Sequence, residues 1–326
     1  MQNKISIMTM IVVVGLFCGL TNIGHAETLP PSPQKIKSQE YLNLIYQNLS
    51  LSEPLQQVTM IPQSPDDSEG TNLSRQRELH TIAFQHENVG TFKITVNGPK
   101  GFLDSNKKYP LLFVTSGFQT GAKTALLFHT RQDLIVVGYE YPSNISQIAK
   151  DPSLMLKTIR VVPGQIALSL KFLSEQKWVE SRQLSALGIS LGGLFLPVSL
   201  KLAEKIQVSV QSTIFAYTGT QIQSIIEYSM GKYLDENIRS LFGQLLQNIL
   251  TLHDPSVHAP ELTGRFLVIQ GTQDQVFPTE STQSLFDLLP EKKELVKIEG
   301  EHIDLGRDKL IQQTIQVIEN WLKKVN

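Results

Sequence analysis

A serine between glycines is the residue of this chain that is best placed for covalent chemistry. Ser190 lies in the run LGISLGG at 187–193, which fits the pattern G-x-S-x-G between an apolar stretch and a helical one. The flanking glycines let the backbone pass closely, so the serine is held in a strained conformation with its hydroxyl exposed. The following helix presents amide donors beside that hydroxyl. The pattern therefore predicts Ser190 as a nucleophile.

A histidine and an aspartate further along the chain could activate this serine. A serine hydroxyl is a weak nucleophile unless a base takes its proton and a third group orients that base. Asp274, in GTQDQVFP at 271–278, and His302, in IEGEHID at 298–304, each follow an apolar stretch. Alone, a histidine is often structural, and an aspartate in a turn often caps its own backbone. Their order after Ser190 and their shared position behind strands favour a catalytic triad.

Other interpretations of the polar residues are plainer. The glycine-rich turn could be an accidental loop or could cradle a phosphate, but a phosphate loop would supply a lysine that is missing here. His253, Asp254 and His258 match no zinc spacing, so we expect them on the surface or in a lid. No metal and no cofactor is expected. The remaining histidines, His80, His86 and His129, are expected to have a structural role.

Apolar stretches that alternate with helical ones would position the site. Residues 80–84 and 92–96 alternate apolar and polar positions around a turn, as in an antiparallel pair. Continuous apolar runs, typical of parallel strands covered on both faces, begin at residues 111, 134, 184, 210, 265 and 294. Helices are expected at 163–178, after Pro278 and at 308–324. Pro163 would lie in a first turn. The sequence therefore predicts a mostly parallel α/β sheet with its site at the carboxyl ends of the strands.

From about residue 80 to its end, the chain resembles the α/β-hydrolase superfamily. GISLGG is similar to the nucleophile elbow of that family, GTQDQVFP to its acid turn and GEHIDL to its histidine loop. The resemblance implies a doubly wound sheet of about eight strands and hydrolysis through an acyl-enzyme. It also implies an oxyanion hole of two backbone amides. One is that of Leu191; for the other Phe118 aligns best, with Gln119 as the alternative. Pro197 departs from the family, and a kinked or shortened helix is expected there.

The chain divides into a leader, an N-terminal segment and one domain. Lys4, the apolar run at 5–20 and the small residue Ala26 have the layout of a secretory signal peptide. An uncleaved anchor and a lipid-modified Cys18 are the alternatives. The predicted divisions are a signal peptide at 1–26, a tether with a short helix and a polar loop at 27–76, and a hydrolase domain at 77–326. Within that domain, a helical insertion at 219–261 is either a lid or padding.

Composition narrows the classes of function. The chain has 326 residues, of which 41% are hydrophobic, enough for one large domain. Its Lys+Arg count of 29 nearly balances its Asp+Glu count of 30, so no nucleic-acid partner is expected. Cys18 is the only cysteine, so a processed chain would have neither a disulfide nor a thiol nucleophile. Export without cysteine favours a bacterial periplasm or the medium.

These features together predict an exported serine hydrolase that cleaves an acyl ester, in the manner of an esterase or lipase. A serine peptidase or amidase is the alternative, because ester and amide cleavage share one triad. A non-catalytic binding protein on a hydrolase scaffold is a further alternative. The expected partner is a small-molecule or lipid-like acyl substrate, with no stable membrane span after signal removal and no prediction of oligomeric state. The aromatic residues that would suit an acyl chain are Phe118, Tyr141, Phe195 and Phe277.

Export gives the first testable prediction. If the leader is a signal peptide, the protein purified from the periplasm or the medium should begin at Glu27, directly after the small residue at the expected cleavage position. Intact mass spectrometry measures this end directly. A chain that still begins at Met1 would contradict cleavage.

Overall fold

A single mixed sheet forms the centre of the molecule. The computed structural model describes residues 38–63, 76–117, 120–128, 131–142, 153–231, 250–304 and 306–325, with positions 147, 151, 235, 236 and 240. The nine strands of the sheet follow the order β1-β2-β3-β5-β4-β6-β7-β8-β9. They are β1 (Gln57–Gln63), β2 (Arg77–His86), β3 (Gly90–Pro99), β4 (Tyr109–Thr115), β5 (Ile135–Glu140), β6 (Val179–Ile189), β7 (Ser212–Ala216), β8 (Arg265–Gly271) and β9 (Lys293–Ile298).

The strand directions confirm the prediction of a mostly parallel α/β sheet. The pairs from β4 and β5 across to β9 are all parallel, whereas β1, β2 and β3 pair antiparallel with their neighbours. The expected antiparallel pair is β2 and β3, where Phe84 lies opposite Phe92 and the two rings stack. The sequence did not indicate β1. It comes from the 27–76 segment and joins the sheet because it pairs along its whole length with β2.

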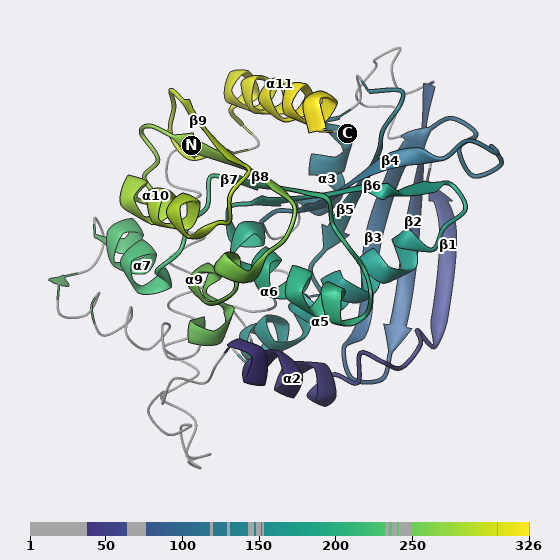
Figure 1. Cartoon of the computed structure of the whole chain (residues 1–326), viewed down its shortest axis with the longest axis horizontal. Helices are drawn as coiled ribbons and strands as arrows, with labels where there is room; N and C mark the ends of the chain where they lie inside the picture. Colours follow the sequence, from purple (N-terminus) through teal and green to yellow (C-terminus); the bar gives the residue numbers. More distant parts are fainter. Residues whose placement is uncertain are drawn as a thin grey trace.

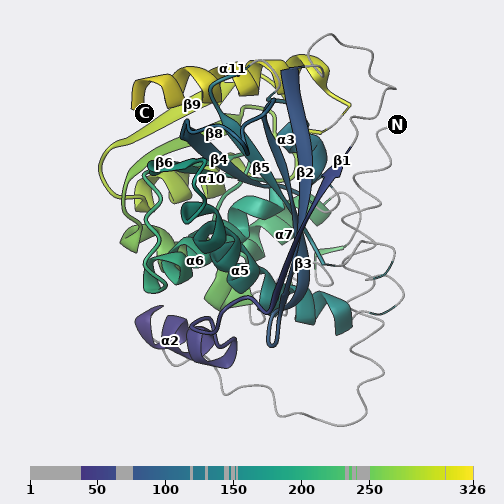
Figure 2. The ribbon, with the colours of Figure 1, turned by 90° about the vertical axis from the view of Figure 1, so that its right-hand side faces the viewer.

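Helices cover both faces of this sheet. The described helices are α2 (Ser38–Asn48), α3 (Gly121–Leu126), α5 (Ser153–Ser174), α6 (Leu191–Lys205), α7 (Ile222–Met230), α9 (Pro255–His258), α10 (Thr279–Leu288) and α11 (Asp308–Val325), with the 3-10 helices η3 (Thr251–His253) and η4 (Ala259–Glu261). Figure 1 shows α11 on one side of the sheet and α5 and α6 on the other, and Figure 2 shows the same layers from the side.

The apolar strand runs follow from this double cover. In β4, Leu111 and Phe113 pack into the core shared with α5 and α6, whereas Leu112 and Val114 pack into the core shared with α11. Successive side chains of a strand point to opposite faces, so a strand covered on both faces must be apolar at every position. The two cores therefore account for the continuous runs seen in the sequence.

Two helices tolerate prolines that were expected near an end or a kink. Helix α5 begins at Ser153, so Pro163 lies in its interior rather than in its first turn. Helix α6 continues through Pro197 to Lys205, so the expected shortening is wrong. Burial of the neighbouring apolar residues, such as Val162 in α5 and Val198 in α6, outweighs the hydrogen bond that each proline removes.

The leader lies outside the described residues, so cleavage after Ala26 stays a prediction. Among the helices that are described, none has both the length and the apolar composition needed to cross a bilayer.

Arg77 connects the antiparallel strands to the parallel part of the sheet. Its side chain is buried at the start of β2 and donates to the Asn97 side-chain oxygen at 2.8 Å and to the Asn97 carbonyl at 2.7 Å. It also donates to the carbonyls of Leu134, at 2.9 Å, and Arg131, which precede β5. One guanidinium thus serves acceptors on β3 and on the approach to β5.

Removal of this guanidinium should cost stability. Arg77→Met leaves several buried acceptors without a donor, so we expect the free energy of unfolding to fall by about 3 kcal/mol. Urea denaturation followed by circular dichroism measures the change. Arg182→Met, at an exposed position of β6, is the matched control, and its free energy of unfolding should stay near that of the parent. Equal losses in the two variants would contradict this role of Arg77.

Candidate active site

Ser190 occupies a sharp turn between β6 and α6. Its φ of 53° and ψ of −123° lie in a region that residues with a side chain rarely adopt. The Ser190 amide donates to the carbonyl of Ala216 at the end of β7, at 3.0 Å, which ties the turn to the neighbouring strand. The strained conformation that the glycine pattern predicts is therefore present.

Close backbone contacts explain the glycines of this turn. A Cβ on Gly188 would lie 2.7 Å from the Gly193 Cα, and a Cβ on Gly192 would lie 2.3 Å from the Thr115 carbonyl oxygen. Neither approach leaves room for a side chain. The buried Thr115 hydroxyl lies 3.1 Å from the Gly192 carbonyl and can donate to it, which adds a polar contact between β4 and α6. The turn is thus packed against β4, and the Ser190 amide bonds it to β7.

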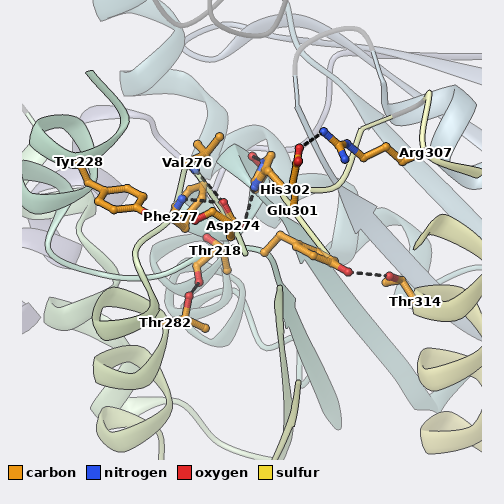
Figure 3. Close-up of polar contacts among 12 residues, drawn as sticks. Thr218, Tyr228, Asp274, Val276, Phe277, Thr282, Glu301, His302, Arg307 and Thr314 are labelled. Atoms are coloured by element: carbon orange, nitrogen blue, oxygen red, sulfur yellow. Dashed lines mark hydrogen bonds and ion pairs between the residues drawn. The ribbon is translucent and has the colours of Figure 1, made fainter. Parts of the chain in front are cut away.

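His302 and Asp274 meet Ser190 in one hydrogen-bonded series. His302 Nε2 lies 2.9 Å from Ser190 Oγ, and His302 Nδ1 lies 2.8 Å from Asp274 Oδ2. The second oxygen of Asp274 accepts the amides of Val276 at 2.8 Å and Phe277 at 2.9 Å, so both carboxylate oxygens are engaged (Figure 3). Asp274 and His302 are buried. The structure therefore brings together the three residues of the predicted triad.

The strand order explains why residues so far apart in sequence meet. Ser190, Asp274 and His302 follow β6, β8 and β9, and these parallel strands end at the same edge of the sheet. Next to β6 lies β4, and the helices that follow these two strands, α6 and α3, pack on opposite faces. A crevice opens at such a switch point, where ligands bind in open α/β sheets.

Two aromatic rings hold the imidazole of His302. Phe277 stacks on it with centroids 5.6 Å apart and an interplanar angle of 19°. Tyr217 meets it edge-on at 6.1 Å, and the Tyr217 hydroxyl lies 3.0 Å from the hydroxyl of Thr314 on α11. Burial raises the pKa of Tyr217, so this hydroxyl stays protonated. Tyr217 also has a positive φ of 52°. No local sequence pattern identified it, because its contact with His302 is long-range.

The loop that carries His302 is fastened to the acid turn. The amides of Thr272 and Gln273 donate to the carbonyls of Ile298 and Gly300, at 3.0 and 2.9 Å. Glu301, beside His302, forms an ion pair with Arg307 ahead of α11, as Figure 3 shows. These contacts hold the imidazole and its carboxylate partner in register.

One of the two expected oxyanion donors lies within the described residues. Leu191 is the first residue of α6, where an amide has no acceptor inside the helix. This amide adjoins Ser190. Phe118 and the alternative, Gln119, lie outside the described residues, so the second donor stays a prediction.

The ends of the loop that carries those two positions are well anchored. The Ser116 and Thr120 hydroxyls lie 2.7 Å apart, and Thr120 donates to the Gly117 carbonyl at 2.7 Å. Beyond the loop, the Glu140 carboxylate at the end of β5 accepts the Ala122 amide. Burial raises the pKa of Glu140, and this hydrogen bond opposes that effect.

The histidines of the 219–261 insertion are buried, so of the two expected positions, on the surface or in a lid, the surface is wrong. His253 bonds the Tyr41 hydroxyl at 3.1 Å, and His258 bonds the Leu252 carbonyl at 2.9 Å. Burial, with a smaller contribution from His258, lowers the pKa of His253 to about 4. A cavity of about 240 Å³ is lined by Tyr41 and His253 among others, and by none of the three residues of the predicted triad. The described residues contain no group of three or more His, Cys, Asp or Glu side chains that could hold a metal ion.

The aromatic residues expected near an acyl chain separate into two places. Phe277 lies against His302. Phe195 is buried in the core, where its ring contacts Tyr141 at 6.3 Å and His253 at 6.0 Å. Phe118 lies outside the described residues.

The sheet order, its helical layers and the strand-end site define the α/β-hydrolase fold. Solved structures with this fold are similar to most of this chain. Acetyl xylan esterase 1 from Thermoanaerobacterium sp. has a TM-score of 0.62 at 16% identity, over 87% of this chain and 94% of its own. An acetyl xylan esterase from Paenibacillus sp. has a TM-score of 0.61 at 14% identity, over 88% and 96%. A prolyl endopeptidase reaches 0.57 at 14% identity, over 77% of this chain but 39% of its own.

Comparisons of sequence give less. The model of a family described as PhoPQ-activated pathogenicity-related protein matches residues 211–326, which include Asp274 and His302 but not Ser190. Comparison with curated protein sequences finds no match. The structural likeness, at these identities, establishes the fold.

The close packing of Gly192 can be tested directly. Gly192→Ala would force a methyl group into the Thr115 carbonyl, so we expect the free energy of unfolding to fall by about 3 kcal/mol. Gly306→Ala is the control, because a Cβ there meets nothing within 4 Å. Urea denaturation of both variants measures the difference. A Gly192→Ala protein as stable as Gly306→Ala would show that the turn has room to relax.

Proposed function

We propose that this protein is a serine hydrolase that cleaves an acyl ester through Ser190, His302 and Asp274. The observation that carries the proposal is the hydrogen-bonded series of these three side chains, with distances of 2.9 and 2.8 Å. The strained backbone of Ser190 adds support, because strain at a serine in a strand-to-helix turn is the mark of a nucleophile elbow.

The geometry suits a two-step acyl transfer. Ser190 Oγ adds to the ester carbonyl carbon while its proton passes to His302 Nε2, and the carbonyl oxygen becomes an oxyanion. Asp274 orients the imidazole and stabilises its charged form. The Leu191 amide, and a second amide expected at Phe118, would donate to the oxyanion, and one such donor typically contributes about 3 kcal/mol to transition-state stabilisation. The alkoxide leaves with the proton of His302. Water then adds to the acyl-enzyme with His302 as base, which releases the acid and restores Ser190.

An ester is the first substrate class. Support comes from the acetyl xylan esterases, which resemble this chain along nearly its whole length. The buried ring of Phe277 stacks on His302, so the surroundings of the imidazole are apolar, as is usual in sites for small organic substrates.

A serine peptidase or amidase is the second candidate. Support for it is the resemblance to a prolyl endopeptidase, which is limited to a part of that protein. The ratio of kcat/KM for p-nitrophenyl butyrate to that for an aminoacyl p-nitroanilide distinguishes the two. We further propose that the protein is exported, with a signal peptide at 1–26 that is cleaved after Ala26.

Labelling and turnover test the triad. A fluorophosphonate probe should label the parent protein and should not label Ser190→Ala. Asp274→Asn should lower kcat for p-nitrophenyl butyrate by about 10³-fold or more, because loss of the carboxylate leaves the imidazole in the wrong tautomer. Asp287→Asn, at an exposed position of α10, is the control and should retain activity. A folded parent protein that is not labelled would refute the assignment. So would an Asp274→Asn variant whose kcat is within about twofold of the parent's.

A further inference from the structure

Among the described residues of the 219–261 insertion, Tyr228 contacts the predicted triad. The Tyr228 hydroxyl, on α7, donates to the main-chain carbonyl of Asp274 at 3.0 Å. Figure 3 shows the Tyr228 side chain beside Phe277 and Asp274. The carboxylate of Asp274 is held by His302, Val276 and Phe277, so the contact from Tyr228 fixes a different part of the same residue.

Helix α7 is itself held firmly at its first turn. The carboxylate of Asp254, which is 2% exposed, accepts the amides of Gln221 at 3.2 Å and Ile222 at 2.8 Å. It also accepts the Thr220 hydroxyl and, from the other end of the insertion, the Ser256 amide at 2.9 Å. One buried carboxylate therefore joins both ends of the insertion and caps α7.

The base of the insertion is also bonded to α10, the helix that follows the acid turn. The Ser281 hydroxyl donates to the Thr220 carbonyl at 2.5 Å, and the Thr282 hydroxyl donates to the Thr218 carbonyl at 2.8 Å. The acid turn thus lies between α10 on one side and Tyr228 of α7 on the other. A movement of α7 as part of a lid would break the contact with Asp274.

We propose that Tyr228 is a positioning residue for the acid of the triad, and that α7 is a fixed wall of the site rather than a moving part. The proposal rests on the proposed function of Ser190, His302 and Asp274. Tyr228 fixes the main chain of Asp274, so that the carboxylate stays aligned with His302 Nδ1. A small displacement of a group that orients a base lowers the rate of the chemical steps far more than it changes substrate binding.

Tyr228→Phe tests this role, because it keeps the half-exposed ring and removes only the hydroxyl. We expect kcat for p-nitrophenyl butyrate to fall about tenfold while KM stays within about twofold. The proton resonance of His302 Nδ1–H should shift, since it reports the bond to Asp274. Tyr46→Phe on α2, away from the triad, is the control and should change neither value. An unchanged kcat and resonance, or a change confined to KM, would overturn the proposal.

A second variant tests whether the effect passes through α7. Asp254→Asn weakens the cap of α7, so it should lower kcat in the same way, and the double variant with Tyr228→Phe should be less impaired than the product of the two single effects. Fully multiplicative effects would show that the two residues act independently and would overturn the fixed-wall role. Fluorophosphonate labelling distinguishes a failure of the proposed hydrolase function from a failure of the positioning role. An unlabelled parent refutes the proposed hydrolase, whereas a labelled parent with an unaffected Tyr228→Phe refutes only the positioning role.

Discussion

The backbone turn at Ser190 is the constraint on which the rest of the site depends. A serine with a φ of 53° carries strain of about 1–3 kcal/mol, and such a conformation persists only where the surroundings fix it. Gly188 and Gly192 allow β4, β6 and α6 to approach closely enough to do so. The bond from the Ser190 amide to Ala216 adds the next strand. Packing of the whole central sheet therefore holds one hydroxyl at the switch point.

Asp274 and His302, which follow β8 and β9, lie beside this hydroxyl at the same edge of the sheet. The loops after β8 and β9 are bonded to one another, so Asp274 and His302 are held beside each other. Phe277 and Tyr217 restrict the imidazole from two sides, and Tyr217 is anchored in turn to α11 through Thr314. The aromatic contacts exclude water from the pair, which strengthens the bond between carboxylate and imidazole.

A hydrogen bond also connects the insertion to the acid turn. Its two ends meet at the buried carboxylate of Asp254, and α7 extends from there to the acid turn. The buried histidines of the insertion, His253 and His258, pack against Tyr41 of α2, which joins the N-terminal segment to the hydrolase fold.

Local patterns in the sequence predicted the parallel sheet and singled out Ser190, Asp274 and His302, because buried strands and glycine-flanked turns leave such patterns. Tertiary structure alone decided that β1 joins the sheet and that α6 continues through Pro197. It also decided that Tyr217 and Tyr228 contact the site. These features depend on pairing and packing between segments distant in sequence, and such contacts leave no periodic signal within the segments themselves.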